Sequence, residues 1–281
     1  MFTIFLHSLS RSRGAIIGWG LSLALLGGYL VGFYDTLANQ QEQLQKLISQ
    51  YPPELMAAFG SMDEMFTPHG YLNVEFFSYM PLILGIYSVL AGSALVAGDE
   101  ENGILDLVLA HPISRTEVFL GRLLAFTCAT IGILAVSWLG FVLAAPGTDL
   151  EVSAGELILP FVSLFAVLML FGTLALALSM LLPSSRLAAM TSGMLLVASF
   201  FITTLERLDP ELEKLADFSP LNYYQGGLAL QEMEWGWIGG LVAFGVLFAV
   251  IAWWRFERRD IRVGGEGGWR LPVLLGRRIG G

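Results

Sequence analysis

Six apolar runs divide the chain, and each is long enough to cross a lipid bilayer. A membrane-spanning helix needs about 20 predominantly apolar residues, because each residue of a helix advances about 1.5 Å. The pattern therefore predicts an all-α integral membrane protein with six transmembrane helices. We place these helices near residues 15–33, 79–97, 123–145, 157–182, 187–205 and 237–254.

The composition agrees with a membrane protein and excludes several other classes. Of the 281 residues, 55% are hydrophobic and 14% are charged, whereas a soluble domain carries about 25% charged residues. The net charge of −9 disfavours nucleic-acid binding. The single cysteine, Cys128, cannot form a disulfide within the chain, and no metal site is expected because the three histidines are scattered.

The basic residues predict which side of the membrane each loop faces. If both termini are cytoplasmic, 12 of the 15 Lys and Arg residues fall in inner segments. The other three, Lys46, Arg207 and Lys214, fall in outer segments. Cytoplasmic loops are enriched in Lys and Arg, so we expect both the N-terminus and the C-terminus to be cytoplasmic.

Two outer segments are long enough to contain short extracytoplasmic helices. After the first span, apolar spacing over residues 44–51 predicts one helix, and residues 52–60 allow a second. Before the last span, Asp209 followed by Pro210 is typical of a helix start. Residues 218–230 then allow two interpretations: a re-entrant piece packed against protein, or a helix on the outer surface.

The predicted spans contain few polar side chains. Their central parts contain no Asp, Glu, Lys, Arg or His, which disfavours an ion-coupled secondary transporter. A translocation path could still be lined by hydroxyl groups. The alternative is that these hydroxyls bond to backbone carbonyls and serve helix packing. The candidates are Thr127, Thr130, Ser137, Ser163, Thr173 and Ser179.

The sequence offers no catalytic motif and one packing motif. HExxH and GxSxG are absent, and neither lysine lies in a Walker A loop, so we expect this chain to be non-catalytic. Two GxxxG spacings in the first span, which let helix backbones approach closely, indicate either packing within the bundle or a dimer contact. Their glycines are Gly14, Gly18, Gly28 and Gly32.

The inner loop between the second and third spans has the most specific pattern. Acidic residues at 99–101 place negative charge at an expected helix start, where the helix dipole favours it. Pro112 ends that helix, because proline cannot continue it. Ser114 and Glu117 then have the spacing of a capping box. We predict an amphipathic helix over 99–110 along the inner surface, a sharp break, and the third span.

With this loop, the sequence resembles the permease subunits of ABC-2-type ABC transporters. It is most similar to the branch that includes nitrous-oxide-reductase maturation and gliding-motility permeases. The resemblance implies a permease domain over residues 1–263, a Gly/Arg-rich cytoplasmic tail over 264–281, and a place in the plasma membrane, the cytoplasmic membrane of a prokaryote. It rests on residues 67–78, 99–107, 110–115, 219–224 and 256–263.

By this resemblance, residues 99–110 form a coupling helix that docks on a separate cytoplasmic ABC ATPase, expected in two copies. That partner would bind ATP and Mg, and this chain would bind no cofactor. A second permease chain, identical or different, would complete an exporter of amphipathic, lipid-like or drug-like cargo. The alternatives are a non-transporting membrane anchor and, less favoured, a secondary transporter. The expected coupling residues are Asp99, Glu100, Glu101, Gly103, Ile104, Leu105, Leu107, Val108, His111, Pro112, Ser114 and Arg115.

Overall fold

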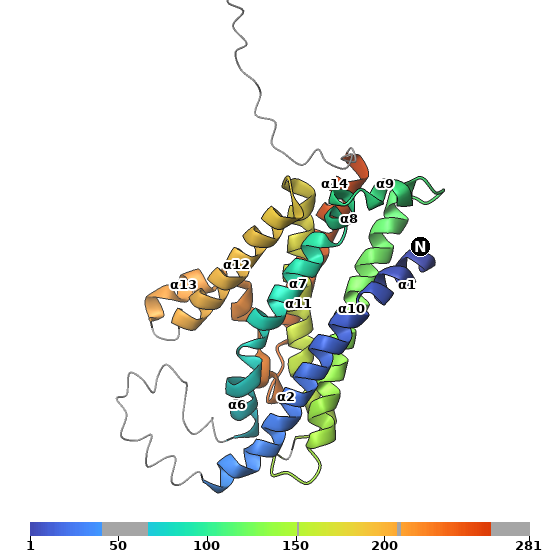
Figure 1. Cartoon of the computed structure of the whole chain (residues 1–281). Coiled ribbons are helices and arrows are strands. Elements are labelled where there is room, and N and C mark those ends of the chain that lie inside the picture. The colour runs from blue at the N-terminus through green and yellow to red at the C-terminus, as the bar shows by residue number, and fades with distance from the viewer. Residues whose placement is uncertain (41–66, 151, 207–208, 260–281) are drawn as a thin grey trace, which may run out of the picture.

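The computed structural model describes residues 1–40, 67–150, 152–206 and 209–259, and every regular element in these ranges is helical (Figure 1). The predicted outer helices over 44–60 lie outside the described residues. The long helices are α2 (Arg13–Asn39), α10 (Arg115–Ala144), α11 (Ala154–Leu181), α12 (Ser185–Glu206) and α14 (Trp235–Arg258). The shorter elements are α1 (Phe2–Arg11), α6 (Pro68–Leu72), the π-helix η1 (Asn73–Phe77), α7 (Met80–Ala94), α8 (Ala97–Glu101), α9 (Ile104–Leu109), η2 (Pro210–Leu212), α13 (Glu213–Ala216), η3 (Pro220–Tyr223) and η4 (Gly226–Leu230).

Five of the six predicted spans are continuous helices. The long helices α2, α10, α11, α12 and α14 are each long and apolar enough to cross a membrane. They correspond to the spans predicted near 15–33, 123–145, 157–182, 187–205 and 237–254. The protein is therefore a multi-pass membrane protein. It has a sixth span if the bent pair formed by Pro68–Phe77 and Met80–Ala94 is counted as one.

The span predicted near 79–97 corresponds to α7, whose 15 residues are long and apolar enough to cross a membrane only together with the bent segment before them. α7 ends at Ala94, and the apolar segment continues before it through α6 and η1, with a bend of 41°. Pro81 explains part of this break, because it has no N–H to donate to the carbonyl of Phe77, four residues earlier. The Tyr224 hydroxyl donates to that carbonyl instead, at 2.9 Å.

The bundle is built around α11. In its most apolar stretch 72% of the residues are buried, against 22–39% in the other four long helices. At one end of the bundle, aromatic rings from η1, α10 and α11 form an edge-to-face cluster. Edge-to-face rings stabilise a core beyond the area they bury. The rings belong to Phe76, Phe77, Phe141 and Phe161.

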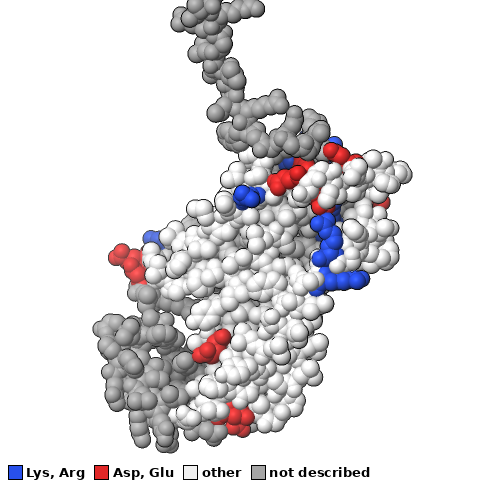
Figure 2. Space-filling view, in the orientation of Figure 1, with Lys and Arg blue, Asp and Glu red and all other residues white. Residues whose placement is uncertain are grey.

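The two ends of the bundle differ in charge. We name them the α9 end, with α1, α8 and the C-terminus of α14, and the α6 end, with α6 and the start of α14 (Figure 1). Among the described residues, every Lys and Arg except Lys214 lies toward the α9 end of its element. Arg122, seven residues after the start of α10, is the farthest of them from an element terminus. In Figure 2 the basic side chains accordingly gather in the upper part of the molecule. This asymmetry matches the pattern from which cytoplasmic termini are predicted.

The segment before the last span packs into the α6 end. A 3-10 turn, η2, begins after Asp209, whose carboxylate accepts a hydrogen bond from the N–H of Glu211 (3.0 Å). Residues 218–230 form η3 and η4, which pack against α12, α14, α11 and η1 rather than forming a helix on the surface. The N–H of Gln225 donates to the Ser163 hydroxyl of α11 (3.1 Å). Residues 218–230 therefore pack against the bundle, and their entry into the membrane stays a prediction.

Candidate coupling site

The segment between α7 and α10 contains two short helices rather than one. Asn102 follows α8 and donates from its side chain to the carbonyl of Gly98 (2.7 Å), and α9 begins after Gly103. Gly103 has a φ of 68°, in the left-handed region that glycine reaches without steric penalty. A right-handed helix cannot continue through that conformation, so the predicted single helix over 99–110 is wrong.

Asp99 of α8 lies in a buried ion pair. Its carboxylate contacts Arg122 of α10 at 2.7 Å and Arg11 of α1 at 3.2 Å. The Arg122 guanidinium is almost fully enclosed and also donates to the carbonyl of Leu95 (3.1 Å). A buried charge needs a partner and hydrogen bonds to offset its loss of hydration, and this arrangement supplies both.

The next two acids connect α8 to the last two long helices. Glu100 is buried and pairs with Arg259, which also donates to the carbonyl of Met180 (3.2 Å). The Glu101 carboxylate accepts bonds from the N–H (2.6 Å) and hydroxyl (2.8 Å) of Ser185. We name Asp99, Glu100 and Glu101 the α8 acids. All three are engaged inside the chain and precede the break, so they fasten α8 to the bundle rather than begin α9.

The short helix α9 has one face toward the bundle and one face away from it. Leu105 is 1% exposed and packs with core residues of α10, α11 and α14, with Val108 partly buried beside it. On the opposite side, Ile104 is 40% exposed and Leu107 is 70% exposed. We name Ile104 and Leu107 the outer face of α9. A partner protein can reach the outer face, but it cannot reach Leu105.

The predicted end of the amphipathic helix and the predicted capping box are confirmed. α9 stops at Leu109, before the exposed His111 and Pro112. The Ser114 hydroxyl then accepts from the N–H of Glu117 (3.1 Å), whose carboxylate accepts from the N–H of Ser114 (3.1 Å). Arg115 follows and donates to the carbonyls of Phe256 (3.1 Å) and Arg259 (2.5 Å), so it caps the end of α14.

The six hydroxyl residues considered for a translocation path form hydrogen bonds within the chain. Ser163 accepts from the N–H of Gln225, as described above. The others donate to a carbonyl three or four residues earlier in their own helix, which is the bonding expected of the packing alternative. These are Thr127, Thr130, Ser137, Thr173 and Ser179.

The GxxxG glycines of α2 do not pack closely within the bundle. An added Cβ atom at Gly28 would make only ordinary contacts, at 3.6 Å or more. At Gly20 and Gly27 the same atom would collide with side chains of α10, so these two glycines allow the close approach of α2 and α10. A dimer contact through the GxxxG glycines stays a prediction. The positions with open space are Gly14, Gly18 and Gly32.

Sequence reasoning missed the basic partners of the α8 acids. Arg122 is one of the 12 basic residues assigned to inner segments, and it lies seven residues after the start of α10, directly before a long apolar run. A charge beside such a run requires a counter-charge, and this signal points to the acids just before that helix. The pairing of Arg259 with Glu100 has no such local signal, because the two residues are 159 positions apart.

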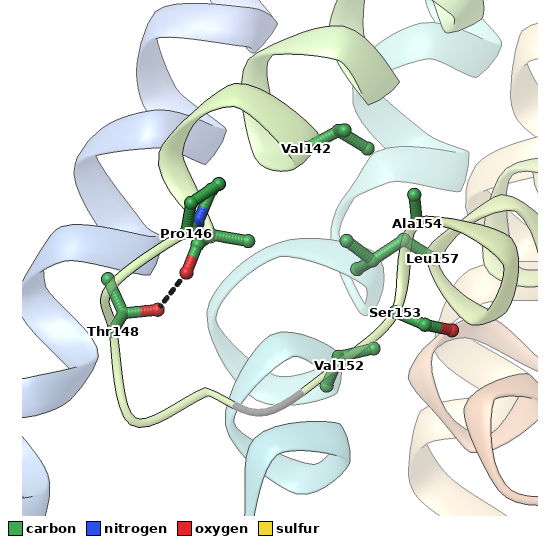
Figure 3. Close-up of a pocket in the computed structure, with 8 residues that line it drawn as sticks. Val142, Pro146, Thr148, Val152, Ser153, Ala154 and Leu157 are labelled. Atoms are coloured by element: carbon green, nitrogen blue, oxygen red, sulfur yellow. Dashed lines mark hydrogen bonds between the residues drawn. The ribbon is translucent and has the colours of Figure 1, made fainter.

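A hollow of about 410 Å³ lies at the α6 end, between the end of α10 and the start of α11 (Figure 3). Its walls include Val142, Pro146 and Leu157, and none of its described lining residues is charged. The Thr148 hydroxyl beside it donates to a backbone carbonyl.

Comparison with known families decides the family of this chain. The sequence profile of a family described as "ABC-2 family transporter protein" matches residues 2–261. The chain belongs to that family. A search of curated proteins finds no match. ABC-2 proteins are transmembrane components of ABC transporters, generally non-catalytic, and they associate with an ABC ATPase.

Proposed function

We propose that this chain is the membrane subunit of an ATP-driven exporter and that the outer face of α9 docks on a separate, cytoplasmic ATP-binding subunit. The observation that carries the proposal is the exposure of Ile104 and Leu107 on a helix whose other face is fixed to the bundle. Exposed apolar side chains on a rigid support are suited to anchor a protein interface.

The α8 acids give this contact a mechanical connection to the membrane helices. Asp99 joins α8 to α1 and α10, Glu100 joins it to α14, and Glu101 joins it to the start of α12. A displacement of α9 by the ATPase would therefore be transmitted to α1, α10, α12 and α14. The ion pairs and hydrogen bonds of the α8 acids would transmit it, because breaking them costs free energy. In this account the α8 acids position the coupling site, and the partner contacts α9 itself.

We propose further features of the exporter, which family membership and composition support. The partner would bind ATP and Mg, because this chain has no Walker A loop. Two permease chains and two ATPase chains would form the complex, within the branch that includes the nitrous-oxide-reductase maturation and gliding-motility permeases. The apolar spans suit amphipathic or lipid-like cargo better than free ions, since the central parts of the predicted spans carry no charge.

The docking proposal is tested by Ile104→Glu combined with Leu107→Glu. An interface hot spot is worth at least about 2 kcal/mol, so the pair of charges should weaken ATPase binding about 30-fold or more. The ATPase should then be lost when the permease is purified. The fold should survive, because both side chains face away from the bundle.

A matched control places the same charges at the other end of the bundle. Leu215 and Phe218 are 50% and 87% exposed, and Leu215→Glu with Phe218→Glu should leave the ATPase bound. If the α9 variant keeps a full complement of ATPase, α9 is not the docking site. If the ATPase binds but its turnover never responds to any cargo, the alternative of a non-transporting anchor gains support.

A further inference from the structure

A second cavity at the α6 end has the features of a ligand site. Its volume is about 460 Å³, and it lies between η1, α7, α12, the turn at 219–231 and the start of α14. Small-molecule sites are typically cavities of about 300–1,000 Å³ with mostly apolar walls and a few polar groups. This cavity is at the opposite end of the bundle from α9, so it is separate from the coupling site.

Four aromatic side chains line the cavity. Tyr79 of α7 is 52% exposed and Trp237 of α14 is 44% exposed. Phe200 of α12 and Tyr224 add two more rings. The faces of aromatic rings carry partial negative charge and attract cations, and sites for quaternary ammonium groups are built in this way.

The charged side chains of the wall are all acidic. Glu206, Glu232 and Glu234 line the cavity, whereas no Lys or Arg is found among its described lining residues. Acidic and aromatic side chains both favour a positively charged ligand with an apolar body. The acids supply opposite charge, and the rings contact its apolar parts. An anion would meet repulsion from both groups.

Hydrogen bonds hold the floor of the cavity in place. Tyr224 donates to the carbonyl of Phe77, and the N–H of Gly227 donates to the Asn73 side chain (2.9 Å). Burial raises the pKa of the Tyr224 phenol well above its ordinary value, so it remains a neutral donor. The Gln225 side chain bonds to the backbone N–H (2.7 Å) and carbonyl (3.2 Å) of Glu234. The site is thus formed before any ligand arrives, which lowers the entropic cost of binding.

We propose that this cavity binds a monovalent organic cation with an apolar body, such as an alkylammonium or phosphonium group. The proposal goes beyond the coupling function and does not depend on an ATPase partner. Its success or failure is therefore distinguishable from that of the docking proposal.

The test measures binding of tetraphenylphosphonium to the purified full-length chain by equilibrium dialysis in nonionic detergent. Tetraphenylborate has nearly the same shape and the opposite charge, so it controls for partition into the micelle. We expect saturable binding of the cation at one site per chain and no saturable binding of the anion. Equal saturable binding of both ions, or of neither, would overturn the proposal.

Two variants locate the site. Glu232→Gln with Glu234→Gln should weaken cation binding about three- to tenfold, as expected for two exposed charges. Glu211→Gln with Glu213→Gln makes the same charge change nearby, outside the cavity lining, and should have no effect. If both pairs weaken binding equally, only net charge matters and the cavity is not the site.

An aromatic variant and a lipid competition complete the experiment. Trp237→Leu should weaken binding about two- to fivefold, the worth of one exposed cation–π contact, and an unchanged affinity would contradict the role of the rings. Competition by phosphatidylethanolamine, but not by phosphatidylglycerol, would assign the cation to a lipid headgroup. Competition by neither lipid would assign it to a free organic cation.

Discussion

Removing Arg122 should destabilise this permease more than removing any of its exposed arginines. In Arg122→Met, a side chain of similar length without charge replaces the guanidinium that contacts Asp99 at 2.7 Å. The carbonyl of Leu95 also loses its side-chain donor. Asp99 would remain mostly buried, with Arg11 as its remaining cationic contact.

The size of this destabilisation follows from the burial of Arg122 and Asp99. The side chains of Arg122 and Asp99 are only 6% and 12% exposed, and removing one partner of a buried pair costs about 3–5 kcal/mol. Because Arg11 still contacts the carboxylate, we expect the free energy of unfolding to fall by about 3 kcal/mol. The Arg11 side chain is 59% exposed, so Arg11→Met should cost only about 0–1 kcal/mol.

The assay is the unfolding midpoint of the purified protein in one detergent, followed by size-exclusion chromatography after heating. On the scale of soluble domains of 150–250 residues, about 3 kcal/mol corresponds to a drop of about 6–12 °C. Adding Asp99→Asn to Arg122→Met removes the unpaired charge and should recover part of that drop. The argument from burial is refuted if Arg122→Met is no less stable than Arg11→Met. It is also refuted if the midpoint shifts of Arg122→Met and Asp99→Asn simply add in the double variant.

Three further predictions concern packing, orientation and chemistry. Gly92→Ala should destabilise the bundle severely, because its Cβ would collide with the backbone of α11, whereas Gly18→Ala, with open space around it, should be tolerated; equal thermal midpoints would disprove this. In a Cys128→Ala background, an impermeant thiol reagent added to intact cells should label Asp217→Cys and spare Arg186→Cys, and the reverse result would invert the predicted orientation. The purified chain, freed of contaminating ATPases, should show only background ATP turnover, and saturable turnover that survives purification would contradict a non-catalytic role.

Hydrophobic pattern alone predicted five of the long helices, because their signal is an uninterrupted apolar run. It did not predict the bend at the remaining span, where a π-helix interrupts the segment and the Phe77 carbonyl pairs with Tyr224. Tyr224 is 147 residues distant from Phe77, so no local pattern contains this contact. The capping box at Ser114 was predictable, because its two members, Ser114 and Glu117, are only three positions apart.

The candidate site shows the same division between local and distant causes. The stop before Pro112 follows from the chemistry of one residue. The break at Gly103 depends on a positive φ, which a glycine permits but does not require. Which face of α9 is buried depends on α10, α11 and α14, so Leu105 was expected at the partner interface although it lies in the core. The acids were recognised as important, but their partners are set by the tertiary fold.

The central claim is that the ATPase contacts the outer face of α9, and photo-crosslinking tests it directly. Leu107 is replaced by the photoreactive amino acid benzoylphenylalanine in cells that express the permease with its ATPase, and Leu215 at the α6 end receives the same replacement as a control. Both side chains are at least half exposed, so each tolerates the larger group. Irradiation should attach the ATPase at position 107 and leave it unattached at 215. Attachment at position 215 but not at 107 would contradict the claim.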